Sequence, residues 1–230
     1  DTDDPKKIDR EAVCRMVDLF MEQGFGYFDT AYPYHEGLSE TVFQEAVAKR
    51  YPRNAYTITD KLPLYLLRKE EEMEQIFQQQ LNRLGLDFID YYWLHNVGTA
   101  SYAVAQRLGA FEFVRKKKEQ GKVGHIGFSF HDRADLLDRV LMEHPEMEFV
   151  QLQLNYLDWE DTNVQARLCY EAAIRHGKQV MVMEPVKGGT LASLPPQAKE
   201  LLEQYRPGLS PAGWALLFAA SRKEVAMVLS

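Results

Sequence analysis

The chain has 230 residues, 46% of them hydrophobic and 27% charged, which is enough for one sizeable hydrophobic core. The formal net charge is −7, with acidic and basic residues interleaved, whereas nucleic-acid binding requires clustered positive charge. No stretch approaches the roughly 20 apolar residues that cross a bilayer, and no secretory leader is visible. Composition therefore gives no support to a nucleic-acid or membrane partner.

The first half of the chain alternates helical and strand-like segments. Apolar residues at helical spacing predict a first helix that ends at Gly24. Ser39 can cap a second helix that runs to about Arg50, and apolar residues from Met73 to Leu84 share one face of a third. We predict three strands in this half, at residues 27–31, 55–61 and 86–95.

The second half repeats this alternation. One helix ends near Gly121, a second covers residues 136–140 and a third ends at Gly177. Ser210 and Pro211 form the N-cap and first-turn pair of a fourth. We predict four strands in this half, at residues 122–130, 148–154, 178–184 and 224–230.

Strands that alternate with helices indicate a parallel sheet, either doubly wound or closed into a barrel. A doubly wound nucleotide-binding fold should have Gly-x-Gly-x-x-Gly after its first strand, and this sequence has none. We therefore predict an α/β fold, a (β/α)8 TIM barrel, as one domain over residues 1–230. Seven strands and an uncovered last strand predict that the first strand and last helix are missing from this chain. The chain would then be a fragment, or the ordered part of a longer protein.

Other features have simpler interpretations. The basic run from Arg115 to Lys118 lies in a helical pattern and is interpreted as a solvated helix face. Cys14 and Cys169 are interpreted as buried reduced thiols, from which a cytoplasmic location follows. We expect no metal site, because the sequence has neither a paired-cysteine motif nor His-x-His.

Polar residues follow three successive strands. Asp29, Lys61 and His95 lie at strand ends, and Tyr34 lies in the loop after the first of these strands. Singly, each has an ordinary structural explanation, such as a turn cap or a lysine that reaches water. The carboxyl ends of barrel strands face the active-site mouth, so together these residues predict a catalytic site.

The four side chains suit proton delivery. A free tyrosine titrates near pH 10, which is too high for an efficient acid at neutral pH. A neighbouring ammonium favours the phenolate form; Lys61 can supply it, and Asp29 can hold it in place. His95 can donate a hydrogen bond to a carbonyl oxygen. The group suits protonation of the oxyanion that forms when hydride reaches a carbonyl carbon.

The motifs around these residues resemble those of the aldo-keto reductases. They are FDTAYPYHEG with Asp29 and Tyr34, ITDK with Lys61, and DYYWLH with His95. The family's catalytic residues are Asp, Tyr, Lys and His in this order. The resemblance covers essentially the whole chain, through GKVGHIGFS, VQLQLNYLD and MEPVKGG.

The forms SFHD and MEPVKGG are most similar to a bacterial and archaeal branch of the family. Its members often have an extra C-terminal iron–sulfur segment, of which nothing is present here. An iron–sulfur cluster is therefore expected only if such a segment, absent from this chain, exists.

The resemblance implies a nicotinamide cofactor. Its carboxamide would meet Ser129 and Gln151. Its pyrophosphate would lie along a loop of five residues, Pro185, Val186, Lys187, Gly188 and Gly189. Glycines let the backbone approach phosphate and a lysine adds charge, although a plain glycine turn is the alternative.

This chain departs from the family pattern at three places. Phe130 and His131 stand where most relatives have asparagine after the serine. Met183 stands where a tyrosine usually stacks on the nicotinamide, and a thioether packs more loosely. The segment that grips the adenosine phosphate is absent, so NADPH is the family default and NADH the alternative.

Three residues are predicted to wall the substrate pocket: Tyr32, Trp93 and His131. Trp93 shares strand parity with His95, so both should point the same way. Aromatic walls suit a small apolar aldehyde or ketone, whereas core packing is the alternative for Trp93.

The sequence thus predicts an oxidoreductase that reduces aldehyde or ketone carbonyls to alcohols with NAD(P)H, and Tyr34 as the general acid. The partner would be a small-molecule carbonyl substrate. A second hypothesis is a non-catalytic or redox-sensing regulatory subunit built on the same barrel. A third, a metal-dependent hydrolase, lacks clustered histidine and carboxylate ligands.

Overall fold

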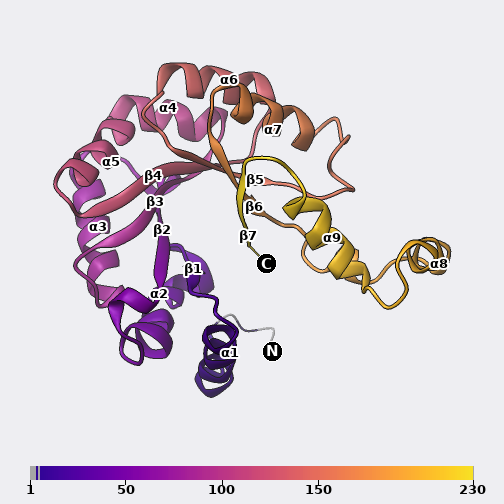
Figure 1. The fold of residues 1–230 in the computed structure, drawn as a ribbon. Helices are drawn as coiled ribbons and strands as arrows, with labels where there is room; N and C mark the ends of the chain where they lie inside the picture. Colours follow the sequence, from indigo (N-terminus) through magenta and orange to yellow (C-terminus); the bar gives the residue numbers. More distant parts are fainter. Residues whose placement is uncertain (1–3, 5, 230) are drawn as a thin grey trace. The chain divides into compact units, whose positions relative to one another are not determined.

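Segments with helical and strand-like periodicity form alternating helices and strands in the structure (Figure 1). The computed structural model describes residue 4 and residues 6–229. The chain divides into two units, residues 1–128 (unit 1) and residues 129–230 (unit 2). Strand β4 (Val123–Phe130) runs through the boundary between them.

Unit 1 contains a parallel sheet with helices packed along it. Besides the first part of β4, its strands are β1 (Tyr27–Asp29), β2 (Thr57–Pro63) and β3 (Ile89–Val97). Its helices are α1 (Arg10–Glu22), α2 (Ser39–Phe43), α3 (Glu71–Leu84), α4 (Thr99–Leu108) and α5 (Ala110–Glu119). The register of β2 and β3 sets Lys61 opposite Trp93 and Asp60 opposite Tyr92. Helix α3 packs on β2 and α5 on β3 (Figure 1).

Helix α3 forms because local signals and burial agree. Acidic residues in its first turn complement the helix dipole, and Gly85, with φ 69°, ends the helix in the left-handed region. Its buried face has four apolar residues, Met73, Phe77, Leu81 and Leu84. The fifth buried residue on α3 is polar, Gln80.

Unit 2 repeats the strand–helix alternation. Its strands after β4 are β5 (Phe149–Gln153), β6 (Gln179–Met183) and β7 (Val225–Val228). Its helices are α6 (Ala134–Glu143), α7 (Ala166–Arg175), α8 (Pro196–Tyr205) and α9 (Pro211–Ala220). The pairs β5–β6 and β6–β7 are parallel. Helix α7 packs on β5 and β6 and α9 on β7, whereas α8 lies away from these strands (Figure 1).

The seven predicted strands are all confirmed, with ends shifted by at most three residues. Ser230, the last residue of the predicted strand 224–230, lies outside the described residues. The cap at Ser210 is confirmed, because its side chain accepts from the Gly213 N–H at 3.0 Å.

Two predictions about α2 need correction, and one helix was missed. The N-cap of α2 is Leu38, and the Ser39 hydroxyl instead accepts a hydrogen bond from Thr30 at 2.7 Å. After Phe43, α2 continues as a π-helical turn, residues 44–48. Helix α8 was not predicted, because its pattern leaves no residue buried.

The basic run on α5 also differs from its prediction. The Lys117 side chain is 9% exposed. Its ammonium pairs with Glu74 at 2.6 Å and lies over the rings of Phe77 and Phe113. The interpretation as a solvated face is therefore wrong for Lys117, whose long stem fills the α3–α5 interface. Over the described part of the chain, no helix combines the length and apolarity needed to cross a bilayer.

Candidate active site

The centre of the candidate site is the Lys61 ammonium, in unit 1. Lys61 lies on β2 and is 1% exposed. Its Nζ donates to Asp29 Oδ1 at 2.5 Å, to the Thr30 carbonyl oxygen at 2.8 Å and to the Tyr34 hydroxyl at 3.4 Å. Three acceptors match the three N–H donors of an ammonium, so the buried charge is compensated.

The turn after β1 presents Tyr34. Its N–H donates to the Ala31 carbonyl at 3.0 Å. Three successive residues then have left-handed φ values: His35 at 50°, Glu36 at 54° and Gly37 at 85°. Such conformations cost on the order of 1 kcal/mol each for a non-glycine residue and concentrate at functional sites. The strained turn leaves the Tyr34 side chain 39% exposed, with its hydroxyl still in reach of Lys61.

His95 completes the group of four predicted residues. It lies on β3, and its ring is 5.8 Å from the Tyr34 ring in an edge-to-face arrangement. Asp29, Tyr34, Lys61 and His95 thus lie together in unit 1, from β1, the loop after it, β2 and β3. Parallel strands in sequential order bring these positions to one end of the sheet.

The predicted cofactor residues lie in unit 2. Ser129 is buried near the end of β4, Gln151 is buried on β5, and Met183 is half-buried at the end of β6. The loop 185–189 follows β6 and has φ values of 51° at Lys187, 57° at Gly188 and 90° at Gly189. Among the described residues, neither glycine N–H donates to a carbonyl oxygen. Exposed N–H groups in a left-handed turn fit a phosphate.

Lys187, predicted to add positive charge to this loop, has a carboxylate partner in the structure. Its ammonium pairs with the Asp158 carboxylate. Asp158 is buried, and its other oxygen accepts from Gln153 Nε2 at 2.8 Å and from Asn155 Nδ2 at 2.7 Å. Burial alone would raise the pKa of Asp158, but the hydrogen bonds from Lys187, Gln153 and Asn155 outweigh it and lower the pKa. The pair ties the loop after β6 to the loop after β5.

Comparison with known proteins identifies the family. The profile described as "Aldo/keto reductase family" matches residues 2–230. The chain belongs to the aldo/keto reductase family. A curated relative, the NADH-specific methylglyoxal reductase of Escherichia coli (strain K12), is 26% identical over 223 residues. That match covers 87% of this chain and 63% of the relative, so the chain spans less than two thirds of the relative's length.

Solved aldo-keto reductase structures show the fold. The holo form of AKR11C1 from Bacillus halodurans matches with a TM-score of 0.73 at 21% identity, covering 96% of this chain and 77% of that one. A Klebsiella pneumoniae enzyme in complex with NADP and acetate matches with a TM-score of 0.72 at 18% identity, covering 96% and 75%. The predicted α/β fold class, the (β/α)8 barrel, is confirmed.

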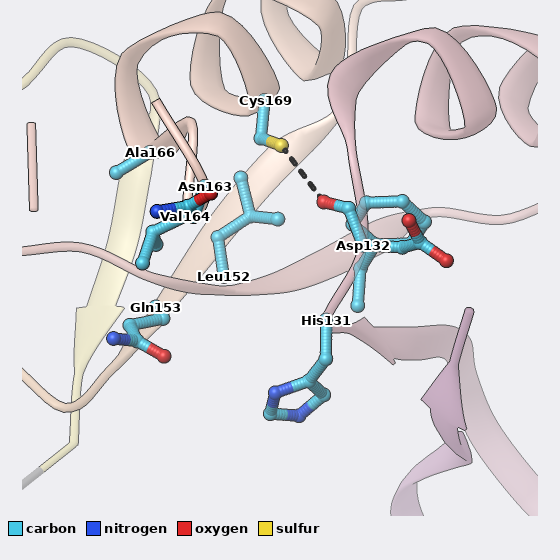
Figure 2. A pocket seen from close by; sticks show the side chains of 9 residues that line it. His131, Asp132, Leu152, Gln153, Asn163, Val164, Ala166 and Cys169 are labelled. Carbon is cyan, nitrogen blue, oxygen red and sulfur yellow. Dashed lines mark hydrogen bonds between the residues drawn. The ribbon is translucent and has the colours of Figure 1, made fainter. Parts of the chain in front are cut away.

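A cavity of about 270 Å³ lies within unit 2. Figure 2 shows His131 and Gln153 at one side of it and Cys169 at the other. The Cys169 thiol donates to the Asp132 carbonyl oxygen at 3.6 Å. Burial, followed by the charges of Asp132 and Asp135, raises the pKa of Cys169 to about 12, so the thiol is not a nucleophile at neutral pH.

The predicted substrate residues have different surroundings. Trp93 is fully buried and packs edge-on against Tyr91, so the core-packing alternative accounts for it. Tyr32 donates to Gln79 Oε1 at 3.0 Å, and the Arg83 guanidinium lies 4.5 Å from its ring centre. His131 lies on the cavity of unit 2.

Sequence reasoning missed two contributors. Tyr65, in the 3-10 turn after β2, has its ring 6.2 Å from the His95 ring and is 42% exposed. An aromatic residue four positions after Lys61 was the available signal. The Thr30 carbonyl, which accepts from Lys61, has no signal in the sequence because any residue supplies a carbonyl. In the described chain, no group of three or more His, Cys, Asp or Glu is arranged to hold a metal ion.

Proposed function

We propose that this protein reduces aldehyde and ketone carbonyls to alcohols with a nicotinamide cofactor, and that Tyr34 is its general acid. The observation that supports this most is the buried Lys61 ammonium, which contacts both the Asp29 carboxylate and the Tyr34 hydroxyl. A lysine buried only for stability needs a carboxylate partner but has no need of an exposed phenol.

The hydrogen-bond direction supports the assignment. Lys61 Nζ donates to the Tyr34 oxygen at 3.4 Å, so the phenol hydrogen remains for another acceptor. A carbonyl oxygen that gains negative charge is such an acceptor. When Tyr34 gives up its proton, the ammonium stabilises the phenolate and Asp29 holds the ammonium in place. His95 donates a hydrogen bond to the same substrate oxygen and orients it.

The cofactor roles are assigned to unit 2. When bound, the nicotinamide cofactor supplies the hydride. We assign its carboxamide to Ser129 and Gln151, its ring face to Met183, and its pyrophosphate to the loop Pro185, Val186, Lys187, Gly188 and Gly189. The E. coli relative is named NADH-specific and the Klebsiella structure contains NADP. We propose NADPH as the preferred cofactor and NADH as the alternative.

The test uses the full-length gene product and Tyr34→Phe. Cofactor binding is titrated by fluorescence, and NADPH oxidation is followed with a panel of small aldehydes and ketones. We expect Tyr34→Phe to lower kcat by roughly 10²-fold or more, because general acid catalysis contributes about that much, and to leave cofactor affinity unchanged. Tyr205→Phe, on exposed α8, is the matched control.

Parental turnover in Tyr34→Phe would show that the acid is another group. Negligible turnover by the parent, with copurification of a stoichiometric protein partner, would favour the regulatory subunit instead.

Further assignments belong to the same proposal. We propose that residues 1–230 are one domain of the family, acting on small-molecule carbonyl substrates in the cytoplasm, where both cysteines stay as free thiols. Substrate contacts are proposed separately for Tyr32 and His131. Alanine at either position should raise KM for the carbonyl with little change in kcat.

A further inference from the structure

A second buried polar cluster lies on the opposite face of β2 from the Lys61 side chain. Neighbouring strand residues point to opposite faces, so Asp60 faces helices α2 and α3. Asp60 and Glu40, the second residue of α2, are both 0% exposed. Neither residue contacts Tyr34 or belongs to the group of four described above. Two fully buried carboxyl groups require compensation.

Only half of the four carboxyl oxygens are compensated. Arg83 Nη1 of α3 pairs with Glu40 Oε2 at 2.9 Å, and Asp60 Oδ1 accepts the Lys61 N–H at 2.8 Å. Glu40 Oε1 and Asp60 Oδ2 are buried and have no partner among the described residues. The Glu40 side chain lies close enough to Asp60 to raise its pKa, both through its charge and through a side-chain hydrogen bond.

Two ionised carboxylates accept hydrogen bonds and donate none, so they cannot satisfy each other. A single proton removes the conflict, because the protonated acid then donates to the other carboxylate. Glu40 is already paired with the Arg83 guanidinium, so we place the proton on Asp60.

The charges around Asp60 agree with this assignment. Burial, and next the negative charge of Glu40, raise the pKa of Asp60 well above the usual aspartate range, against the opposing effects of Lys61. The other titratable groups beside the pair are Arg83 on α3 and Tyr92 on β3, and the Glu74 carboxylate of α3 acts on Tyr92. Burial raises the pKa of Tyr92 as well, so its phenol stays neutral.

The same cluster holds the main chain of Lys61 on both sides. Asp60 accepts its N–H, and Gln80 Nε2 donates to its carbonyl oxygen at 3.0 Å. Gln80 is fixed in turn by the Tyr92 hydroxyl, which donates to Gln80 Oε1 at 2.6 Å. A buried amide in a helix–sheet interface, with both ends hydrogen-bonded, fixes the strand relative to the helix.

We propose that Glu40 and Asp60 share one proton, and that this neutral Asp60 together with Gln80 positions Lys61. The catalytic consequence rests on the proposed function, whereas the shared proton does not. An ionised Asp60 would place a second carboxylate near the ammonium and weaken its effect on Tyr34. The proton therefore keeps the charge of Lys61 directed to Asp29 and Tyr34.

The first experiment detects the proton without reference to activity. In Asp60→Asn, the amide oxygen still accepts the Lys61 N–H and the amide nitrogen can donate to Glu40, but the group no longer titrates. A carboxyl group whose folded pKa is raised stabilises the fold below its unfolded pKa of about 3.9 and loses that contribution as pH rises towards the folded pKa.

Across that window the folding constant of Asp60→Asn relative to wild type should rise up to tenfold per pH unit. The infrared carbonyl band of a protonated carboxylic acid should be present in wild type at pH 7 and absent from the variant. Equal pH slopes, or no difference in that band, would overturn the shared proton.

The second experiment detects the positioning. We expect Asp60→Ala and Gln80→Met to lower kcat about tenfold, with the carbonyl KM and cofactor affinity unchanged, and Asp60→Asn to restore most of the loss in Asp60→Ala. Gln75→Met, on the exposed face of α3, is the matched control. Hydrogen exchange of the Lys61 amide, read by NMR, should speed up at least tenfold relative to other β2 amides in Asp60→Ala and recover in Asp60→Asn.

If Asp60→Ala does not fold, Gln80→Met still tests the positioning role and Asp60→Asn still tests the shared proton. An unchanged kcat in Gln80→Met, or unchanged Lys61 exchange in both variants, would overturn the positioning role. A wild type without reductase activity would refute the proposed function alone, since the infrared and exchange results stand apart from turnover.

Discussion

Removal of the Lys61 charge tests the core of the proposed mechanism. In Lys61→Met the side chain keeps a similar length but loses the ammonium that lies 3.4 Å from the Tyr34 oxygen. Two full charges at this distance interact by about 5 kcal/mol at an effective dielectric constant of about 20. Tyr34 is 39% exposed, so water screens part of this. With the phenolate charge half developed in the transition state, about 2 kcal/mol remains, which is roughly 30-fold in kcat.

The assay must separate this effect from unfolding. Lys61→Met leaves the Asp29 carboxylate, whose side chain is 18% exposed, without its cation, and an unpaired buried charge costs about 3 kcal/mol or more. Asp29→Asn combined with Lys61→Met removes both charges and should recover stability. We expect the double variant to melt near the parental temperature while its kcat on a small aldehyde stays roughly 30-fold low. Turnover within threefold of the parent, at saturating NADPH, would refute the electrostatic role of Lys61.

Three further outcomes are expected. Gly189→Ala should raise the Kd for NADPH about tenfold, because alanine disfavours a φ of 90°. Gly208 has a φ of 79° and equally open surroundings, so Gly208→Ala should lose similar stability without affecting the Kd. Because the pKa of Asp158 is lowered in the folded state, Asp158 stabilises the fold at pH values above its ordinary pKa of 3.8 and loses this contribution as the pH falls. Asp158→Asn should therefore be less stable than wild type at pH 7, and urea titrations at acid pH should show this difference closing. Cys169 should remain unalkylated in native Cys14→Ser at pH 8, and stoichiometric labelling there would contradict the raised pKa.

The candidate catalytic group could be predicted from the sequence because its prediction needs only the ends of the strands and their order. Each of Asp29, Lys61 and His95 lies at the end of an apolar strand, where a core residue would be expected. Parallel strands in sequential order place such ends side by side whatever the detailed packing. The contacts of Lys61 with Asp29 and Tyr34 required no finer knowledge of the structure.

The cluster behind Lys61 could not be predicted in the same way. Asp60 and Gln80 look like ordinary polar residues of a strand and of a helix, and Glu40 looks like an acid in a first helical turn. Only the packing of α3 on β2 and of α2 on α3 makes all three buried. The interpretation of Lys117 as part of a solvated face was wrong for the same reason, since its burial depends on where α5 meets α3. Periodicity assigns a face to a helix but does not reveal which polar residue that face will bury.

The two lysines of the proposed site have different roles, and burial explains the difference. Lys61 and Lys187 each pair with an aspartate, but the Lys61 side chain is 1% exposed and the Lys187 side chain 34%. The buried pair is poorly screened, so exchanging its partner would cost several kcal/mol, and Lys61 stays fixed on Asp29. The Lys187 ammonium reaches water, and the buried Asp158 carboxylate keeps its hydrogen bonds from Gln153 and Asn155 when that ammonium leaves. A pyrophosphate can therefore draw Lys187 from Asp158 at a smaller cost than any partner exchange at Lys61, and Asp158→Asn should accordingly tighten NADPH binding by a few fold.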